Sequence, residues 1–228
     1  MARFDVHQLE GMNYVLAVLD NEMIRAEAGA FCYMTGDIVI DSKLIPSIGG
    51  AIKSLLASEA VYRPTYTGTG AITLESSFGG FQVLELHDEA WILERGAYWA
   101  SEGSVNVSYY RESVLTALWA GEGLVYLQTK VSGSGKVLVT TRGPIETIEV
   151  TPGKNIVAED GFVIARTPGV SMKIRRPTRT YFGRFTAGEP FVRVFAGEGR
   201  VLLNPSPYWR YRMFNEREGA SPHASQIE

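Results

Sequence analysis

Apolar and polar residues alternate in short runs along most of this chain, and glycine interrupts these runs at regular intervals. In residues 125–131 the odd-numbered positions are more apolar than the even-numbered ones, which is the pattern of a strand with one buried face. The 24 glycines and 10 prolines provide many turns, and frequent turns fit short strands better than long helices. The pattern therefore predicts an all-β protein.

A first marker, Glu-x-Gly between two apolar runs, occurs three times. Its copies are Glu27-Ala28-Gly29, Glu94-Arg95-Gly96 and Glu159-Asp160-Gly161. Gly29 and Gly96 are 67 positions apart, and Gly96 and Gly161 are 65 positions apart. Near-equal spacing of the same pattern indicates an internally repeated unit.

Two further markers recur in the same order. The second marker is Gly-x-Gly, and it leads into the strand-like runs 71–74, 136–139 and 200–203. Its copies are Gly68-Thr69-Gly70, Gly133-Ser134-Gly135 and Gly197-Glu198-Gly199. A third marker precedes each of these and carries Glu59, Glu122 or Glu189. Glycines at fixed offsets are expected to provide positive φ angles or close backbone approach at turns and bulges.

The markers predict one domain, residues 1–218, made of three repeated units over about 5–78, 79–143 and 144–214. A unit of this size is marginal alone, so we expect the three to pack around a pseudo-threefold axis. Apolar spacing predicts a short helix at 51–56 and another at 112–119. The tail, 219–228, is expected to be disordered.

The ordered markers resemble those of bacterial and archaeal proteins related to the altered-inheritance-of-mitochondria protein family. The Glu-x-Gly turns and four other segments carry the likeness, which covers roughly residues 5 to 210: Gly49-Gly50, Ala120-Gly121-Glu122-Gly123, Gly133-Ser134-Gly135 and Ala187-Gly188-Glu189. The resemblance implies a short double-stranded β-helix like the trp RNA-binding attenuation protein. It also implies assembly into rings, so that three units per chain would form a trimer. The family has no settled bacterial activity.

Charge is divided unevenly along the chain. Residues 1–150 hold 10 Lys and Arg against 18 Asp and Glu, a net −8, whereas residues 151–228 hold 12 against 7, a net +5. An acidic front and a basic back would suit head-to-tail self-association, or a basic surface for an anionic partner. Solvated faces that happen to differ in charge would give the same counts.

The recurring glutamates Glu27, Glu94 and Glu159 are candidate ligands for a hard cation, if they converge near the symmetry axis. In the alternative that we favour, each carboxylate satisfies backbone amides at its own turn. The glutamates of the third marker allow the same two interpretations.

No catalytic constellation is found. His7, His87 and His223 stand alone, without the clustered histidines of a cupin-type metal site, and we expect His87 to lie at a surface turn. The single cysteine, Cys32, is expected to be a small buried hydrophobe. Phosphate-loop and Gly-x-Ser-x-Gly patterns are absent from the sequence. We therefore predict no catalytic or metal residues, no cofactor and no enzymatic activity.

Two basic segments occur in the third unit. One carries Lys173, Arg175, Arg176 and Arg179; the other carries Trp209, Arg210 and Arg212 between tyrosines. Basic and aromatic side chains together suit RNA or anion binding, and they also suit a subunit interface. We favour core and interface roles for the aromatic segment.

The sequence thus favours a non-enzymatic scaffold or interaction protein that acts as a homo-oligomer, with a trimer expected. An RNA- or anion-binding ring and a small-molecule-binding module with sites between units stay open. No stretch reaches the roughly 18 apolar residues of a transmembrane helix. The first residues lack the apolar region of a secretory signal, so a cytoplasmic protein is expected.

Overall fold

The computed structural model describes residues 1–41, 63–77, 79–111, 127–159, 161–175 and 192–205. In these ranges the chain forms strands joined by turns. The strands are β1 (Arg3–Leu9), β2 (Met12–Ala26), β3 (Phe31–Asp41), β4 (Thr65–Ser77), β5 (Gly80–Leu93), β6 (Tyr98–Glu102), β7 (Asn106–Arg111), β8 (Leu127–Thr141), β9 (Glu146–Val150), β10 (Ile156–Ala158), β11 (Val163–Arg166), β12 (Val170–Arg175), β13 (Val192–Gly197) and β14 (Gly199–Leu203).

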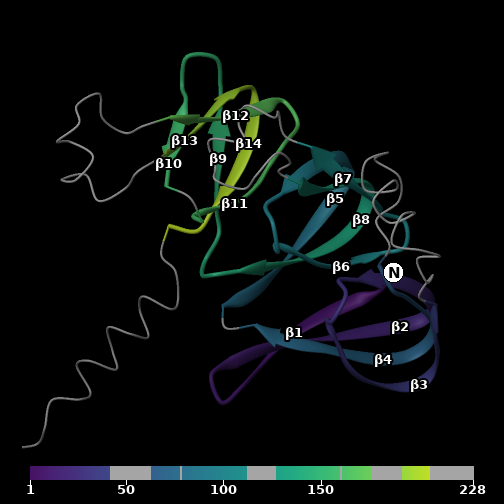
Figure 1. Ribbon diagram of the computed structural model, residues 1–228. Coiled ribbons are helices and arrows are strands. Elements are labelled where there is room, and N and C mark those ends of the chain that lie inside the picture. Colours follow the sequence, from purple (N-terminus) through teal and green to yellow (C-terminus); the bar gives the residue numbers. More distant parts are fainter. Residues whose placement is uncertain (42–62, 78, 112–126, 160, 176–191, 206–228) are drawn as a thin grey trace, which may run out of the picture.

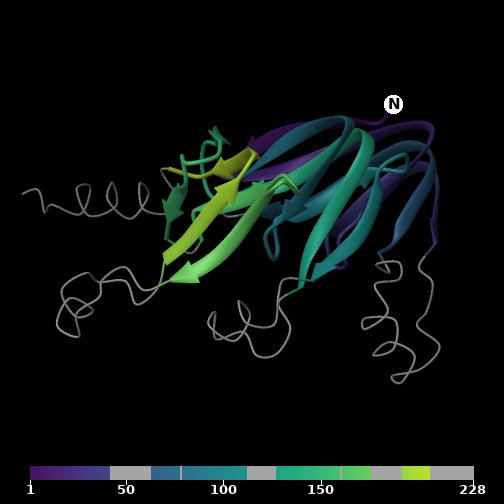
Figure 2. The ribbon, with the colours of Figure 1, turned by 90° about the horizontal axis from the view of Figure 1, so that it is seen from above.

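Most strands belong to one antiparallel sheet in the order β3-β4-β2-β6-β8-β5-β11-β14-β9, with β1 added to β2 and β7 added to β8. A second sheet has the order β10-β13-β12. The N-terminal strands lie at one end of the molecule and β9 to β14 lie at the other (Figures 1 and 2). The predicted all-β class is confirmed. The pseudo-threefold axis and the likeness to the trp RNA-binding attenuation protein stay predictions.

Two strand pairings join segments that belong to different predicted units. We call the pairing of β2 with β6 the first seam and the pairing of β5 with β11 the second seam. Both are antiparallel and short. In the first seam, the end of β2, just before the first Glu-x-Gly marker, pairs with β6, just after the second marker. In the second seam, the end of β5, just before the second marker, pairs with β11, just after the third marker.

The apolar core is divided into three clusters along the molecule. The first is built mainly from β1 to β4 and the second mainly from β5 to β8, while the third lies among β9 to β14. Neighbouring units share clusters, because Ala100 and Leu138 belong to the first cluster and Ala165 and Leu202 to the second. Alternation explains the buried faces: Val15, Ala17 and Leu19 of β2 point inward while their neighbours are more exposed.

The Glu-x-Gly markers form the turns between strands. Gly29, Gly96 and Gly161 adopt φ angles of 87°, 75° and 88°, in the left-handed region that glycine tolerates without a Cβ clash. The first two turns are each closed by a hydrogen bond, from Ala30 N to Glu27 O at 3.1 Å and from Ala97 N to Glu94 O at 3.0 Å. The predicted role of these glycines in turns is confirmed.

The Gly-x-Gly markers let strands cross in close contact. All six glycines have φ between 103° and 154°. A Cβ on Gly68 would lie 2.0 Å from the Asp37 carbonyl oxygen. In the first two markers, the hydroxyl of the middle residue binds a bulge in the paired strand. Thr69 Oγ1 accepts a hydrogen bond from Asn21 N at 2.9 Å, and Ser134 Oγ accepts one from Asp88 N at 3.0 Å. Positive φ and close backbone approach were both expected.

One prediction about the core was wrong. Cys32 is exposed, because it lies on β3, whose only partner among the described strands is β4. The predicted helices at 51–56 and 112–119 and the tail at 219–228 lie outside the described residues. The described part of the chain contains no helix that is long and apolar enough to span a membrane.

Candidate functional site

A buried polar network lies at the second seam. Arg193 of β13 forms an ion pair with Glu94 at 2.9 Å, and both side chains are largely buried. Gln128 of β8 donates from Nε2 to Glu94 Oε1 at 2.8 Å and accepts from Arg166 Nη2 at 3.1 Å. Residues from both sides of the seam are thereby linked through one carboxylate and one amide.

Arg166 is the most deeply buried charge of this network. It is 1% exposed, its Nη1 donates to the Val170 carbonyl at 2.9 Å, and its guanidinium lies 5.3 Å from the Tyr110 ring centre. A buried cation costs several kcal/mol unless hydrogen bonds and neighbouring groups compensate. These contacts fix the Arg166 side chain, so the network is rigid and suited to holding the seam in one register.

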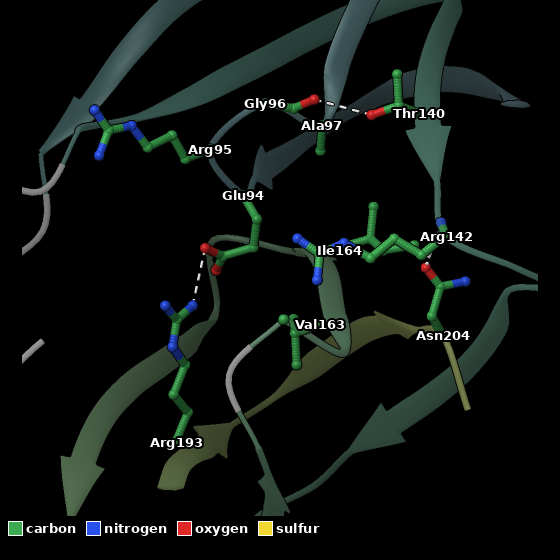
Figure 3. Close-up of a pocket in the computed structure, with 11 residues that line it drawn as sticks. Glu94, Arg95, Gly96, Ala97, Thr140, Arg142, Val163, Ile164, Arg193 and Asn204 are labelled. Atoms are coloured by element: carbon green, nitrogen blue, oxygen red, sulfur yellow. Dashed lines mark hydrogen bonds and ion pairs between the residues drawn. The ribbon is translucent and has the colours of Figure 1, made fainter. Parts of the chain in front are cut away.

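A cavity of about 380 Å³ opens beside this network. Figure 3 shows Glu94 and Arg193 on one side and the Arg142 side chain reaching toward the middle. Val163, Ile164 and Ala97 form apolar parts of the wall. The Glu-x-Gly turns of the second and third units both border the cavity, through Gly96 and Gly161. It is a polar cavity between predicted units.

Arg142 is held in place by its backbone and not by an ion pair. Its N–H donates to Asn204 Oδ1 at 3.0 Å, and Asn204 Nδ2 donates to the carbonyls of Gly143 and Pro144, each at 2.8 Å. A Cβ on Gly161 would lie 2.9 Å from Arg142 Nη1, so the glycine leaves room for the guanidinium. Among the described residues, that guanidinium has no hydrogen-bond or ion-pair partner.

The first seam carries a different cluster. Arg63 pairs with Glu27 at 2.5 Å and donates to Thr129 Oγ1 at 3.1 Å. Its guanidinium lies 4.2 Å from the centre of the Tyr98 ring, which is within range of a cation–π interaction. Arg63 is 5% exposed at its side chain and Glu27 is 36% exposed. In this cluster the Arg63 cation stacks on the Tyr98 ring, and the Glu27 carboxylate lies at the edge.

Tyr98 anchors this cluster from β6. Its hydroxyl donates to the Arg25 carbonyl oxygen at 3.2 Å and lies 2.8 Å from Ser101 Oγ. Burial raises the pKa of Tyr98 to about 12, because the phenolate would lose its hydration inside the protein. Tyr98 is therefore a neutral hydrogen-bonding group throughout the physiological pH range.

Two of the three recurring glutamates, Glu27 and Glu94, are partners of buried side chains. Glu27 binds Arg63, whereas Glu94 binds Arg193 and Gln128. We had favoured carboxylates that satisfy amides at their own turns, and the contacts of Glu27 and Glu94 differ from that expectation. Within the described ranges, no three His, Cys, Asp or Glu side chains come close enough together to hold a metal ion. Glu159 is half-buried beside β10.

The remaining candidate residues are scattered. His7 stacks on Tyr14 with ring centres 5.3 Å apart, and His87 is exposed in the bulge next to Asp88. Lys173 and Arg175 are exposed on β12. Several predicted positions lie outside the described residues: Glu59, Glu122, Glu189, Arg176, Arg179, Trp209, Arg210, Arg212 and His223.

Sequence reasoning missed the side chains that contact the glutamates. Arg63 and Gln128 each lie five positions before the first glycine of a Gly-x-Gly marker, and Arg193 lies four positions before Gly197. A long polar side chain at this offset was therefore visible in the sequence. Its partner was not, because Glu27 and Arg63 are 36 positions apart.

Six of the described strands pair with a single partner strand: β1, β3, β7, β9, β10 and β12. Of these, β3 and β10 lie at opposite ends of the molecule (Figure 1). In the described part of the chain, β3 pairs only with β4, and β10 pairs only with β13. Both carry exposed apolar side chains, including Tyr33 and Val39 on β3 and Val157 on β10. Exposed edges with apolar residues are sites where another strand can add.

Comparisons with known proteins include a family model, a curated protein and a solved structure that each match most of the chain. The family model described as mitochondrial biogenesis AIM24 matches residues 6–206. An uncharacterized protein of Streptococcus pyogenes serotype M6 is 24% identical over 205 residues, covering 84% of this chain and 82% of that protein. The X-ray crystal structure of a Streptococcus pyogenes protein matches with a TM-score of 0.70 and 20% identity, covering 96% of this chain and 100% of that one. At this identity the structural match shows the fold alone.

Proposed function

The chain belongs to the mitochondrial biogenesis AIM24 family, as its glycine markers indicated, and from this premise we propose that it is a non-enzymatic interaction protein that works as a homo-oligomer. A trimer in the cytoplasm is the assembly that we propose. The residues that bind the recurring glutamates support a structural role, because Arg63 and Arg193 are buried and engaged within the fold.

The observation that carries this proposal is that β3 and β10, at opposite ends of the molecule, each have an open edge with exposed apolar residues in the described part of the chain. β3 has 11 residues and, in the ranges described, a free outer edge with exposed Phe31, Tyr33, Val39 and Ile40. Proteins usually protect such an edge with charge, proline, a bulge or a cover. β3 has a bulge between Phe31 and Tyr33 and carries Asp37 and Asp41, but it leaves these apolar side chains exposed. An apolar edge at one end and a second open edge at the other suit association between chains.

The charge distribution supports association in a head-to-tail sense. The acidic part, residues 1–150, contains β3, and the basic part, residues 151–228, contains β10. Opposite net charges of −8 and +5 would attract unlike ends of two copies and repel like ends. Exposed charges are screened by salt over about 8 Å at physiological ionic strength, so this term favours orientation more than affinity.

Native mass spectrometry of the full chain tests the proposal, with light scattering after size-exclusion chromatography as a second measure. We expect one oligomeric species, a trimer, that persists on tenfold dilution in the micromolar range. A monomer at all concentrations would overturn the homo-oligomer. A different closed stoichiometry would correct the trimer and keep the interaction role.

A second candidate function rests on the cavity of the second seam. Arg142 reaches into it without an ion-pair partner among the described residues, and Val163 and Ile164 provide an apolar wall beside it. A guanidinium binds carboxylate or phosphate in a two-pronged geometry. This combination fits a small organic anion with an apolar group.

Calorimetric titration with inorganic phosphate, phenyl phosphate and benzoate tests this second function. We expect phenyl phosphate or benzoate to bind more tightly than inorganic phosphate, and Arg142→Gln to abolish the heat of binding. Arg175→Gln, which removes the same charge from exposed β12, is the matched control and should leave binding unchanged. If Arg175→Gln weakens binding and Arg142→Gln does not, the basic surface is the anion site and RNA becomes the next probe.

A further inference from the structure

The two seams inside the chain share one register relative to the Glu-x-Gly markers. In the first seam, Ala26 lies opposite Ala100 and Arg25 lies opposite Ser101. In the second seam, Leu93 lies opposite Ala165 and Ile92 lies opposite Arg166. Counted from the marker glycine, residues at −3 and −4 of one unit therefore pair with residues at +4 and +5 of the next unit.

The same hydrogen bond extends both seams by one residue. Glu27 N donates to the Trp99 carbonyl at 2.7 Å, and Glu94 N donates to the Ile164 carbonyl at 2.8 Å. In both seams the donor is the marker glutamate, and the acceptor is the residue three positions after the next marker glycine. The backbone rule of the seam thus holds for three consecutive positions.

The acceptor conformation is already present in β3. Trp99 lies where the pairing of β6 with β8 shifts register, between Tyr98 and Ala100, and Ile164 lies at the matching shift in β11. Cys32 lies at a register shift between Phe31 and Tyr33 in the pairing of β3 with β4. Cys32 is also three positions after its marker glycine, Gly29. β3 therefore has the same register shift as the seam strands β6 and β11, but no described strand pairs with its outer edge.

The strand that precedes the third marker, β10, has an open edge at the other end of the molecule, among the described strands. The −3 and −4 positions of the third marker are Ala158 and Val157 of β10. At the two internal seams, Arg25 is half-buried and the other seven residues of the four pairs given above are at most 1% exposed: Ala26, Ala100, Ile92, Leu93, Ala165, Ser101 and Arg166. At the open halves, Tyr33 is 56% exposed and Val157 is 50% exposed.

We propose that β10 of one copy pairs with β3 of a second copy in the register of the internal seams. Ala158 then lies opposite Tyr33 of the next copy, Val157 lies opposite Met34, and Glu159 N donates to the Cys32 carbonyl. This inference rests on the proposed homo-oligomer and adds its interface, orientation and register. It buries the apolar residues that the single chain leaves exposed, which is the usual reason for association.

The contact forms between chains because the two halves lie at opposite ends of one chain (Figure 1). It joins unlike surfaces, so each added copy leaves the same two halves open until the rotation closes a ring.

Disulfide trapping in full-length protein tests the register. The glutamate hydrogen bond makes 27/99 and 94/164 hydrogen-bonded pairs, so the neighbouring pair 158/33 is of the close, non-hydrogen-bonded type with Cα atoms about 4.5 Å apart. That separation is within the range of a disulfide, about 4.4–6.8 Å. In a Cys32→Ser background, Tyr33→Cys with Ala158→Cys should form intermolecular disulfides under mild oxidation.

A matched control shifts one cysteine by a single residue. Tyr33→Cys with Val157→Cys uses a more exposed position on the same strand, but neighbouring side chains of a strand point to opposite faces. We expect at least tenfold less cross-linking from this control. More cross-linking from the control than from the test pair would overturn the register.

The outcomes separate this inference from the proposed function. If the native protein is oligomeric and the Ala158→Cys pair does not cross-link, the seam is wrong and the homo-oligomer stands. If the native protein is monomeric and neither pair cross-links, both proposals fail. Tyr33→Lys provides an independent check, because it should dissociate the oligomer while the circular dichroism spectrum and unfolding temperature of the chain show a folded protein.

Discussion

The first and second seams have the same backbone pairing and different side-chain chemistry. At the first seam, Arg63 stacks on Tyr98 and pairs with a partly exposed Glu27. At the second, Glu94 is buried between Arg193 and Gln128, and a cavity opens beside them. The comparison shows that the backbone register is sufficient to define a seam, whereas ligand-binding capacity depends on the side chains that each unit places around it.

The largest effect is expected where the carboxylate is buried. Glu94→Ala removes the ion pair with Arg193 and one partner of Gln128, and removing one member of a buried ion pair costs about 3–5 kcal/mol. Urea unfolding followed by tryptophan fluorescence measures this loss. Glu94→Gln, which keeps the shape and a hydrogen-bond acceptor, should lose less; equal losses would mean that the charge of Glu94 contributes little.

The next effect is a pH dependence of stability that arises at the first seam, where Tyr98 is buried. Because burial raises the pKa of Tyr98 to about 12 from its ordinary value of 10.0, this tyrosine ionises in the unfolded chain first as the pH rises. Stability is therefore retained below pH 10 and declines between pH 10 and 12, by roughly 3 kcal/mol at about 1.4 kcal/mol per pKa unit. Unfolding free energies measured across this range test the expectation.

Tyr98→Phe is the control for that pH dependence. The variant cannot ionise at this position, so its deficit relative to wild type should shrink as the pH rises above 10 and should reverse before pH 12. At neutral pH it should be less stable by about 1 kcal/mol, because the hydroxyl contacts with Arg25 and Ser101 are lost. A variant with the same alkaline decline as wild type would place the ionising group elsewhere.

A smaller effect is expected where the carboxylate is exposed. Glu27→Ala removes the ion pair with Arg63, but Glu27 is 36% exposed and the guanidinium keeps its stacking on Tyr98 and its bond to Thr129. Exposed pairs contribute about 0–1 kcal/mol, so a loss of about 1 kcal/mol is expected by urea unfolding. A loss as large as that of Glu94→Ala would erase the distinction between the seams.

The smallest effect on stability is expected at Arg142. Its side chain is exposed and has no ion-pair partner in the ranges described, so Arg142→Gln should change the free energy of unfolding by less than about 0.5 kcal/mol. Thermal unfolding without added anion measures this value. Since the same substitution should abolish anion binding, a clear loss of stability would mean that Arg142 supports the fold and that the binding test needs Arg142→Lys.

The strand class and the glycine turns could be predicted because they depend on local chemistry. Gly29, Gly96 and Gly161 require positive φ for reasons that act within one turn. The contacts of Glu27 and Glu94 could not be predicted, since their partners come from strands far along the chain. Cys32 was placed in the core because its neighbours are apolar. Those neighbours lie on an edge strand, and sequence periodicity does not distinguish an edge from a centre.

The core is arranged in a row, and that arrangement has a consequence for local opening. Among the described residues, the three clusters contain 15, 13 and 6 buried residues from the N-terminal to the C-terminal end. Strand contacts of β2 with β5 and β6 join the first cluster to the second, and contacts of β5 with β11 join the second to the third. Stability in such an arrangement is close to a sum of local terms, so amide hydrogens of the small sheet, β10, β12 and β13, should exchange with solvent sooner than those of β2 or β8. A neighbouring copy on β10 would slow exchange where the single chain protects its backbone least.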